Sequence, residues 1–447
     1  MRWNQPIQYG SMSDVGFRRH NNQDASIVQM CSDEKIWSRY GHLLLVADGM
    51  GGHAVGELAS KIAVDTVPHA FFKAKQPTVG VALKNAVEAA NAAIHERGTA
   101  NHDFQRMGTT CTALVLSRQG AVIGHVGDSR AYRVRGGRID QLTFDHSLQW
   151  ELLKQAKMKR EDILLNEPRN VITRSLGPEP SVNVDVEGPH PILPGDTYIL
   201  CSDGLTTHVN DAEIGAIAGE LPPPDACRLL VNLANVRGGS DNITVVVARV
   251  GTATADDELE DYAEPEDPGE HHGLHWGWLA AFWAVAILLV SGFSFWLLGS
   301  PGGSLGLTSM GALGAIALIV VWFRYRPVER AEAAAAAADL SETMVWRPYR
   351  TASAKLDPKF LGHLAAIETE LQRAAGEEAW QLDWARHESL FERARKALAD
   401  RNLPHALRYY ASVIDILMAG LHQSRQAKQK QTETSTRPAA DTNDHVA

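Results

Sequence analysis

Aspartates stand at the ends of apolar, strand-like runs in the first 250 residues, and this pattern constrains the fold more than any other feature. The motifs are RRHNNQD (18–24), LLLVADGMGGH (43–53), HVGDSRAY (125–132), YILCSDGL (198–205) and GGSDNITVVV (238–247). If these runs form a sheet, their ends can meet at one edge, where several carboxylates would converge. Such an array of oxygen ligands suits Mg²⁺ or Mn²⁺.

Each aspartate also has an ordinary explanation when it is taken alone. Asp48 and Asp203 each precede a glycine after an apolar run, as in a plain turn. Asp128 fits a turn as well, and Asp241 fits a loop before a strand. The set as a whole favours a pair of metal ions, because several carboxylates would converge at one edge. Two ions that share a water can lower its pKa and direct it at a substrate. The chain has no Gly-rich phosphate loop that would suggest another chemistry.

Composition limits the class of protein and its partners. The chain has 447 residues, enough for two or three domains. Its net charge of -10 argues against nucleic acid as a partner, because phosphate backbones recruit basic faces. The four cysteines are widely spaced without a CxxC pair, which fits free thiols in a reducing compartment. The N-terminal stretch lacks the apolar core of a signal peptide, so we expect the first domain to stay in the cytoplasm.

Composition shifts divide the rest of the chain. Residues 251–274 are acidic and predict a solvated linker. Residues 275–324 hold two uncharged runs, 276–298 and 305–323, each near the ~20 residues that a membrane helix needs. Tryptophans at their ends are typical of a membrane interface. The alternative is a buried helical hairpin of a soluble domain.

The flanks of these runs predict an orientation. Arg324, Arg326 and Arg330 follow the second run, so that end should face the cytoplasm. Two spans would return the chain to the same side. We therefore expect an inner-membrane protein with two spans, both termini in the cytoplasm and the lipid bilayer as a partner.

The C-terminal part predicts helices. Residues 325–355 are interpreted as a linker, and 356–423 carry apolar residues at helical spacing in three segments. The last two segments resemble one tetratricopeptide-type hairpin, although a small bundle or a self-associating tail fits equally. Residues 424–447 are polar and predict a disordered tail.

The ordered series RxxNxD, ADGMGGHxxGE, GDSRxY, LTxDHS, TRSLG, SDGL and SDNITVVV resembles the metal-dependent protein phosphatases of the type 2C (PPM) family, bacterial branch. The resemblance covers roughly residues 8–250 (domain 1–250). It implies an α+β fold, a four-layer α-β-β-α sandwich of two antiparallel sheets flanked by helices. It also implies hydrolysis of phosphoserine and phosphothreonine with Mn²⁺ or Mg²⁺, as two core ions with an optional third.

The resemblance implies a set of metal ligands. Asp48 matches the aspartate that bridges the two core ions, and Gly49 matches the glycine that offers its backbone carbonyl. Asp203 and Asp241 match the other core carboxylates. Asp128 matches the aspartate of a third, weaker site that it shares with Asp203.

The resemblance also implies residues that act beside the ions. Arg18 matches the arginine that grips the substrate phosphate, while Asp24 and Asn242 support the ligands from behind. Gln23 stands where the family often has glutamate, so we expect one ion to be held more weakly or through water. The eukaryotic pattern has a histidine directly after the Asp-Gly pair, whereas here the nearest one is His53. His53 is therefore a candidate general acid, and a structural role fits it equally well.

Two functions remain open at this point. The first is a membrane-anchored cytoplasmic Ser/Thr phosphoprotein phosphatase that opposes a bacterial Ser/Thr kinase. The second is a weakly catalytic adaptor that binds phosphoproteins and recruits through its helical tail. The complete set of Arg18, Asp48, Gly49, Asp203 and Asp241 favours the enzyme.

Overall fold

The computed structural model describes residues 1, 5–51, 54–75, 78–104, 106–154, 171–251 and 348–436, with a few single residues between 287 and 312. The chain divides into two compact units, residues 1–254 with 345–447, and residues 255–344. The first unit is described below. It joins the N-terminal region to the C-terminal helices.

Two antiparallel sheets form the centre of this unit. The first has the order β1 (Ile7–Asp14), β11 (Ile243–Val250), β10 (Thr197–Cys201), β7 (Arg130–Arg135), β8 (Arg138–Gln141) and β12 (Arg350–Ser353). The second has the order β2 (Asp24–Gln29), β3 (His42–Met50), β5 (Cys111–Ser117), β6 (Gly120–Val126) and β9 (Asp185–His190), and β4 (Gly108–Thr109) pairs with β3. The predicted α+β fold with two antiparallel sheets is thus confirmed.

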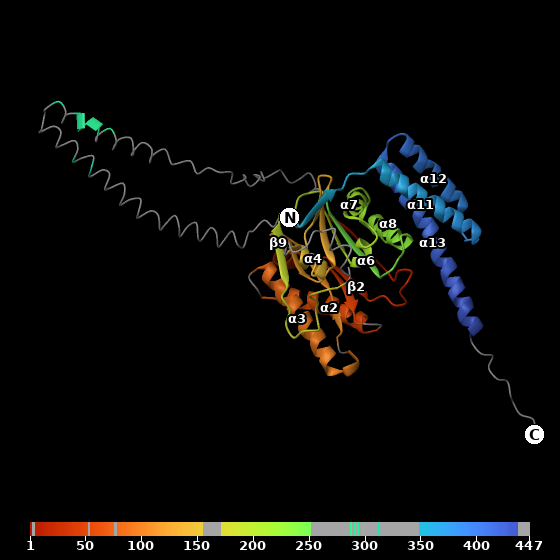
Figure 1. Ribbon diagram of the computed structural model, residues 1–447, viewed down its shortest axis with the longest axis horizontal. Coiled ribbons are helices and arrows are strands. Elements are labelled where there is room, and N and C mark those ends of the chain that lie inside the picture. Colours follow the sequence, from red (N-terminus) through yellow and green to blue (C-terminus); the bar gives the residue numbers. More distant parts are fainter. Residues whose placement is uncertain are drawn as a thin grey trace, which may run out of the picture. The chain divides into compact units, whose positions relative to one another are not determined.

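Helices cover the outer faces of the sheets (Figure 1). α2 (Ala54–Lys73) and α3 (Val79–Ala100) pack on the second sheet, while α7 (Asp211–Glu220) and α8 (Pro223–Val236) pack on the first. The shorter elements are α1 (Glu34–Tyr40), the 3-10 helix η1 (His102–Phe104), α4 (Leu148–Lys154) and α6 (Asp203–Thr206).

The alternation of side chains along β3 shows how the layers arise. Leu43 and Leu45 pack in the core under α2 and α3, whereas Leu44 and Val46 pack in the core between the two sheets. Successive strand residues point to opposite faces, so a strand covered on both sides must be apolar throughout. This requirement explains the unbroken apolar run that precedes Asp48.

The C-terminal part adds a strand and three helices to the same unit. β12 pairs with β8 at the edge of the first sheet, inside the region 325–355 that the sequence predicts as a linker. The helices are α11 (Pro358–Glu377), α12 (Trp384–Ala399) and α13 (Leu403–Thr436), and α13 also packs against α8. α13 continues past residue 423, where the sequence predicts disorder, because the added residues are mostly good helix formers and extend an already anchored helix.

A close approach in this part requires a glycine. A Cβ atom at Gly215 of α7 would lie 2.7 Å from the Ala354 side chain and 2.9 Å from the Ile139 side chain. The missing side chain therefore lets α7 lie directly on β8 and on the end of β12. The C-terminal segment is thus packed into the same core as the N-terminal region.

The predicted inner-membrane location is contradicted by the helices that the structure describes. A helix that crosses a membrane must be both long and apolar. Among the described residues, no helix combines these two properties. Most of the expected membrane hairpin, 275–324, lies outside the described residues.

We expect the C-terminal helices and the sheets to unfold together, because they share one apolar core. Leu364→Ala removes a fully buried side chain of that core, so it should lower the free energy of unfolding by about 2–5 kcal/mol. Denaturant unfolding followed by fluorescence and by circular dichroism should show one shifted transition. Arg373→Ala, on an exposed face of α11, is the control and should change it by less than about 0.5 kcal/mol. Two separate transitions, of which only one shifts, would contradict the shared core.

Candidate metal centre

The predicted aspartates gather at one edge of the two sheets. Asp24 opens β2 and pairs in register with Asp48 near the end of β3. Asp203 follows β10 at the start of α6, and Asp241 lies just before β11. Because β10 and β11 are antiparallel neighbours, the end of one meets the start of the other. Carboxylates from both sheets are thereby brought to the same edge.

A cleft of about 430 Å³ opens at this edge. Its lining includes five of the residues that the sequence predicts for the site: Arg18, Asp48, Gly49, Asp203 and Asp241. Asp24 and Asp128 are buried beside the cleft rather than lining it. His53 lies outside the described residues.

Burial dominates the electrostatics of the carboxylates. It raises the pKa of Asp24 to about 7, of Asp128 to about 8 and of Asp203 to about 6, and nearby aspartates add to each rise. Burial also raises the pKa of Asp48 well above its usual value, as do Asp24 and the other three aspartates. The Asp203 charge adds to the rise of the Asp48 pKa, while the Asp48 side chain lowers the pKa of Asp203, so these two acids affect each other's ionisation. A group of acids that retains protons in this way gains most from a divalent cation.

The residues fit such a cation. The Oδ1 atoms of Asp24 and Asp128 are buried, and neither accepts a hydrogen bond from the residues that the structure describes. Among the described residues, no group of three or more His, Cys, Asp or Glu side chains is arranged so that it could hold a metal ion by itself. Backbone carbonyl and water oxygens would therefore complete the ligand set, as Mg²⁺ and Mn²⁺ commonly require.

Gly49 is held where no side chain would fit. A Cβ atom there would overlap the carbonyl oxygen of Gly56 at the start of α2 and would lie 2.6 Å from the carbonyl oxygen of Gln23. The Gly49 N–H donates to that same Gln23 oxygen at 3.1 Å. The backbone around Asp48 is thus locked between β2 and α2.

The loop of residues 15–23, here called the arginine loop, forms one wall of the cleft. The backbone N–H groups of Phe17 and Arg18 both donate to the carbonyl of Gly239, at 2.8 and 3.0 Å. Arg19 donates to Asp241 at 2.8 Å, while Arg18 forms no ion pair with a described acidic residue. Arg19 is not among the predicted site residues, and its only signal in the sequence is the Arg-Arg pair in the first motif.

Asn242 joins the arginine loop to β11. Its side-chain amide donates to the carbonyls of Val15 and Asn21 at 2.9 and 3.0 Å. Its side-chain oxygen accepts from the N–H of Gln23 at 2.8 Å. Three bonds from one buried side chain fix the loop.

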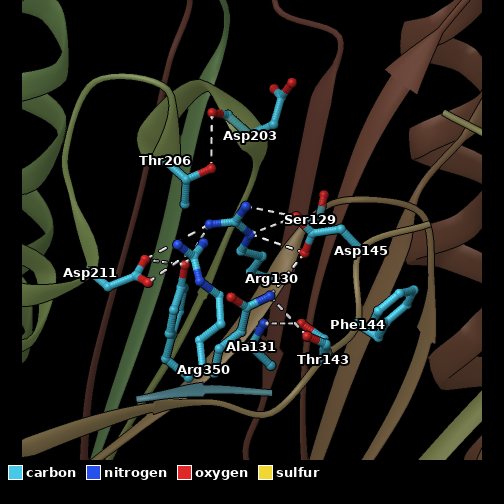
Figure 2. Close-up of polar contacts among 12 residues, drawn as sticks. Ser129, Arg130, Ala131, Thr143, Phe144, Asp145, Asp203, Thr206, Asp211 and Arg350 are labelled. Atoms are coloured by element: carbon cyan, nitrogen blue, oxygen red, sulfur yellow. Dashed lines mark hydrogen bonds and ion pairs between the residues drawn. The ribbon is translucent and has the colours of Figure 1, made fainter. Parts of the chain in front are cut away.

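A second polar network surrounds Arg130 of β7 (Figure 2). Arg130 donates from two nitrogens to Asp145, the shorter bond being 2.6 Å, and lies 3.8 Å from Asp211. Arg350 of β12 lies 4.0 Å from the same Asp211. The positive charge of Arg130 lowers the pKa values of Asp128 and Asp203, although burial outweighs it. The sequence did not reveal this network, because Arg350 lies in the segment that it predicts as a linker.

Comparisons with known proteins agree with this geometry. The family profile described as Protein phosphatase 2C matches residues 18–218. The protein phosphatase PhpP of Streptococcus pneumoniae is 34% identical over 255 residues, which are 56% of this chain and 100% of that protein. The serine/threonine phosphatase stp of Listeria innocua is 35% identical over 243 residues, which are 53% of this chain and 92% of that protein.

A solved structure supports the same likeness. The serine/threonine phosphatase of S. agalactiae superposes with a TM-score of 0.50 and is 34% identical. The match covers 55% of this chain and 100% of that one. The relatives therefore correspond to little more than half of this chain.

The electrostatics of the cleft predict opposite effects of one substitution with and without metal. In chelator at pH 8, Asp48→Asn should raise the melting temperature, because the folded protein must either protonate this buried carboxyl group or bury its charge, whereas the unfolded chain leaves it ionised in water. In Mn²⁺ at 100 times its dissociation constant, wild type should gain about 2.7 kcal/mol. The variant should gain much less. Thermal melts with Mn²⁺ and with chelator measure both effects, and an equal gain in the two proteins would contradict the proposed site.

Proposed function

This chain belongs to the protein phosphatase 2C family and is a metal-dependent protein-serine/threonine phosphatase, and we propose that the acidic cleft is its catalytic centre. The observation that carries this proposal is the meeting of Asp48, Asp203 and Asp241 with Arg18 in the lining of one cleft. Buried, mutually repelling carboxylates next to an arginine that forms no ion pair with a described acidic residue suit a metal-bound phosphate.

The cofactor is Mn²⁺ or Mg²⁺. We assign the two core ions to the carboxylates of Asp48, Asp203 and Asp241 with the carbonyl of Gly49. Asp128, beside Asp203, is assigned to a third and weaker ion. When bound, such ions lower the pKa of a shared water and neutralise charge on a phosphate group.

The remaining side chains orient the site. Asp24 accepts a hydrogen bond from Ser202 at 2.7 Å, and this bond ties the start of β2 to the end of β10 behind the ligands. Arg19 neutralises Asp241 from the solvent side. Arg18 is exposed in the cleft wall, where its guanidinium can form paired hydrogen bonds with phosphate oxygens.

The substrates of this enzyme are proteins phosphorylated on serine or threonine. We further propose that it opposes a Ser/Thr kinase of the same cell, because a phosphatase of this class acts on what such a kinase produces. Removal of phosphate from an autophosphorylated kinase of that cell, measured by mass spectrometry, would test this point. Retention of all the phosphothreonine, while a phosphopeptide is cleaved, would contradict it.

The central prediction is metal-dependent turnover by the full-length protein. With a phosphothreonine peptide, Mn²⁺ or Mg²⁺ should support phosphate release and chelator should abolish it. Asp48→Asn should lower kcat by about 100-fold or more, the scale expected when an essential electrostatic group is lost. Asp65→Asn, an exposed aspartate on α2, should retain wild-type turnover. A folded protein without turnover in either metal would favour the phosphoprotein-binding adaptor instead.

A second prediction concerns Arg18. Arg18→Ala should raise KM by about 10-fold or more, because a charge-assisted hydrogen bond contributes about 1.5–3 kcal/mol. Arg18→Lys should recover part of this loss, since it keeps the charge but not the fork. Steady-state kinetics measure the effect. The control is Arg118→Ala, because Arg118 is exposed in the turn between β5 and β6. An equal rise of KM in that variant would contradict the proposed role of Arg18.

A further inference from the structure

The C-terminal helix α13 touches the arginine loop. The Arg425 guanidinium lies over the Phe17 ring, 4.0 Å from its centroid, and donates to the Phe17 carbonyl at 3.4 Å. The ring of His422 lies 5.7 Å from the same ring, between centroids. Phe17 directly precedes Arg18, so the contact reaches the backbone of the phosphate-binding arginine.

Phe17 is held from two sides. On one side its N–H and that of Arg18 bind the carbonyl of Gly239, two residues before Asp241. This approach is close, because a Cβ atom on Gly239 would lie 2.8 Å from the Phe17 nitrogen. On the other side stand His422 and Arg425. A change in the position of α13 would therefore be transmitted to the arginine loop.

α13 is itself fixed to the phosphatase core. Leu407, Ile414 and Leu417 are fully buried in the core that includes Leu230 of α8. Asp415 lies 3.8 Å from Arg228 of α8. These contacts anchor the first half of the helix, and its rigidity places the second half against Phe17.

The residues that face the first domain recur at helical spacing. Asp415, Met418, His422 and Arg425 are separated by three, four and three residues, so they lie on one face of α13. Met418 is buried in the shared core, Asp415 lies beside Arg228 of α8, and the next two members reach Phe17. Neither His422 nor Arg425 lines the acidic cleft. The helix therefore supports the wall of the cleft and leaves the opening free.

We propose that Arg425 and His422 are positioning residues for phosphate binding. By holding Phe17 they fix the arginine loop, so Arg18 is presented to the substrate in one orientation. The helical tail is then a part of the catalytic unit rather than a separate recruitment module. This inference rests on the proposed role of Arg18 as the phosphate-binding residue.

The experiment uses the full chain with Mn²⁺ and a phosphothreonine peptide. It compares wild type, Arg425→Ala, Arg425→Lys and His422→Ala in KM, kcat and the inhibition constant of inorganic phosphate. Arg425→Ala should raise KM and the phosphate inhibition constant together, by about 5-fold, with kcat within about 2-fold, because a cation–π contact and a hydrogen bond are lost. Arg425→Lys should recover part of the loss, because an ammonium group can still lie over the ring.

A matched control lies in the preceding helix, α12. Arg395 also stands over a phenylalanine, Phe391, with 5.9 Å to the ring centroid, and both belong to α12. Arg395→Ala should leave KM and the phosphate inhibition constant unchanged.

Phe17→Leu gives a second route, since it removes the ring but keeps the apolar bulk. In a double-mutant cycle, the double variant Phe17→Leu with Arg425→Ala should raise the phosphate inhibition constant no more than either single variant does.

The outcomes separate the two proposals. If Arg18→Ala raises both KM and the phosphate inhibition constant and Arg425→Ala raises neither, the positioning role is wrong while the proposed function stands. If Arg425→Ala lowers kcat and the melting temperature without moving the phosphate inhibition constant, the contact is only structural and the inference is wrong. If Arg18→Ala leaves both constants unchanged, the role of Arg18 fails and the positioning role fails with it.

Discussion

The burial of several carboxylates together at one sheet edge is the constraint on which the rest of the structure depends. Asp24, Asp48, Asp128 and Asp203 are held where burial raises the pKa of each. Such a group is unfavourable by itself, so the surrounding fold must oppose its separation. Two apolar sheets stacked face to face provide that opposition, because strands buried on both faces cannot shift in register without exposing their core side chains.

The polar contacts around the cluster follow from this constraint. Ser202 binds Asp24, Arg19 pairs with Asp241, and Arg130 brings positive charge near Asp128. Asn242 fixes the arginine loop through three hydrogen bonds. Each contact holds a wall of the cleft without filling it. The site can therefore keep its shape while a cation and a phosphate group enter.

The C-terminal segment extends the support to both flanks of the centre. β12 brings Arg350 to Asp211 beside Arg130, and α13 brings Arg425 to Phe17 beside Arg18. Both elements belong to the same compact unit as the two sheets. A region that the sequence divides into a linker, a helical domain and a tail is thus joined to the phosphatase domain by packing.

The sequence by itself determined the local parts of the site. Asp48 and Gly49, Asp203, and Asp241 with Asn242 each sit in a short motif whose neighbours already specify a strand end, so their place at one edge followed from alternation and turn residues. Only the tertiary structure decided the pairing of Arg19 with Asp241 and of Arg425 with Phe17, which are 222 and 408 residues apart in the chain. No local period encodes such pairs, because they depend on how separate elements pack. For the same reason β12, a four-residue edge strand with no buried face, carried no apolar signal that a sequence could show.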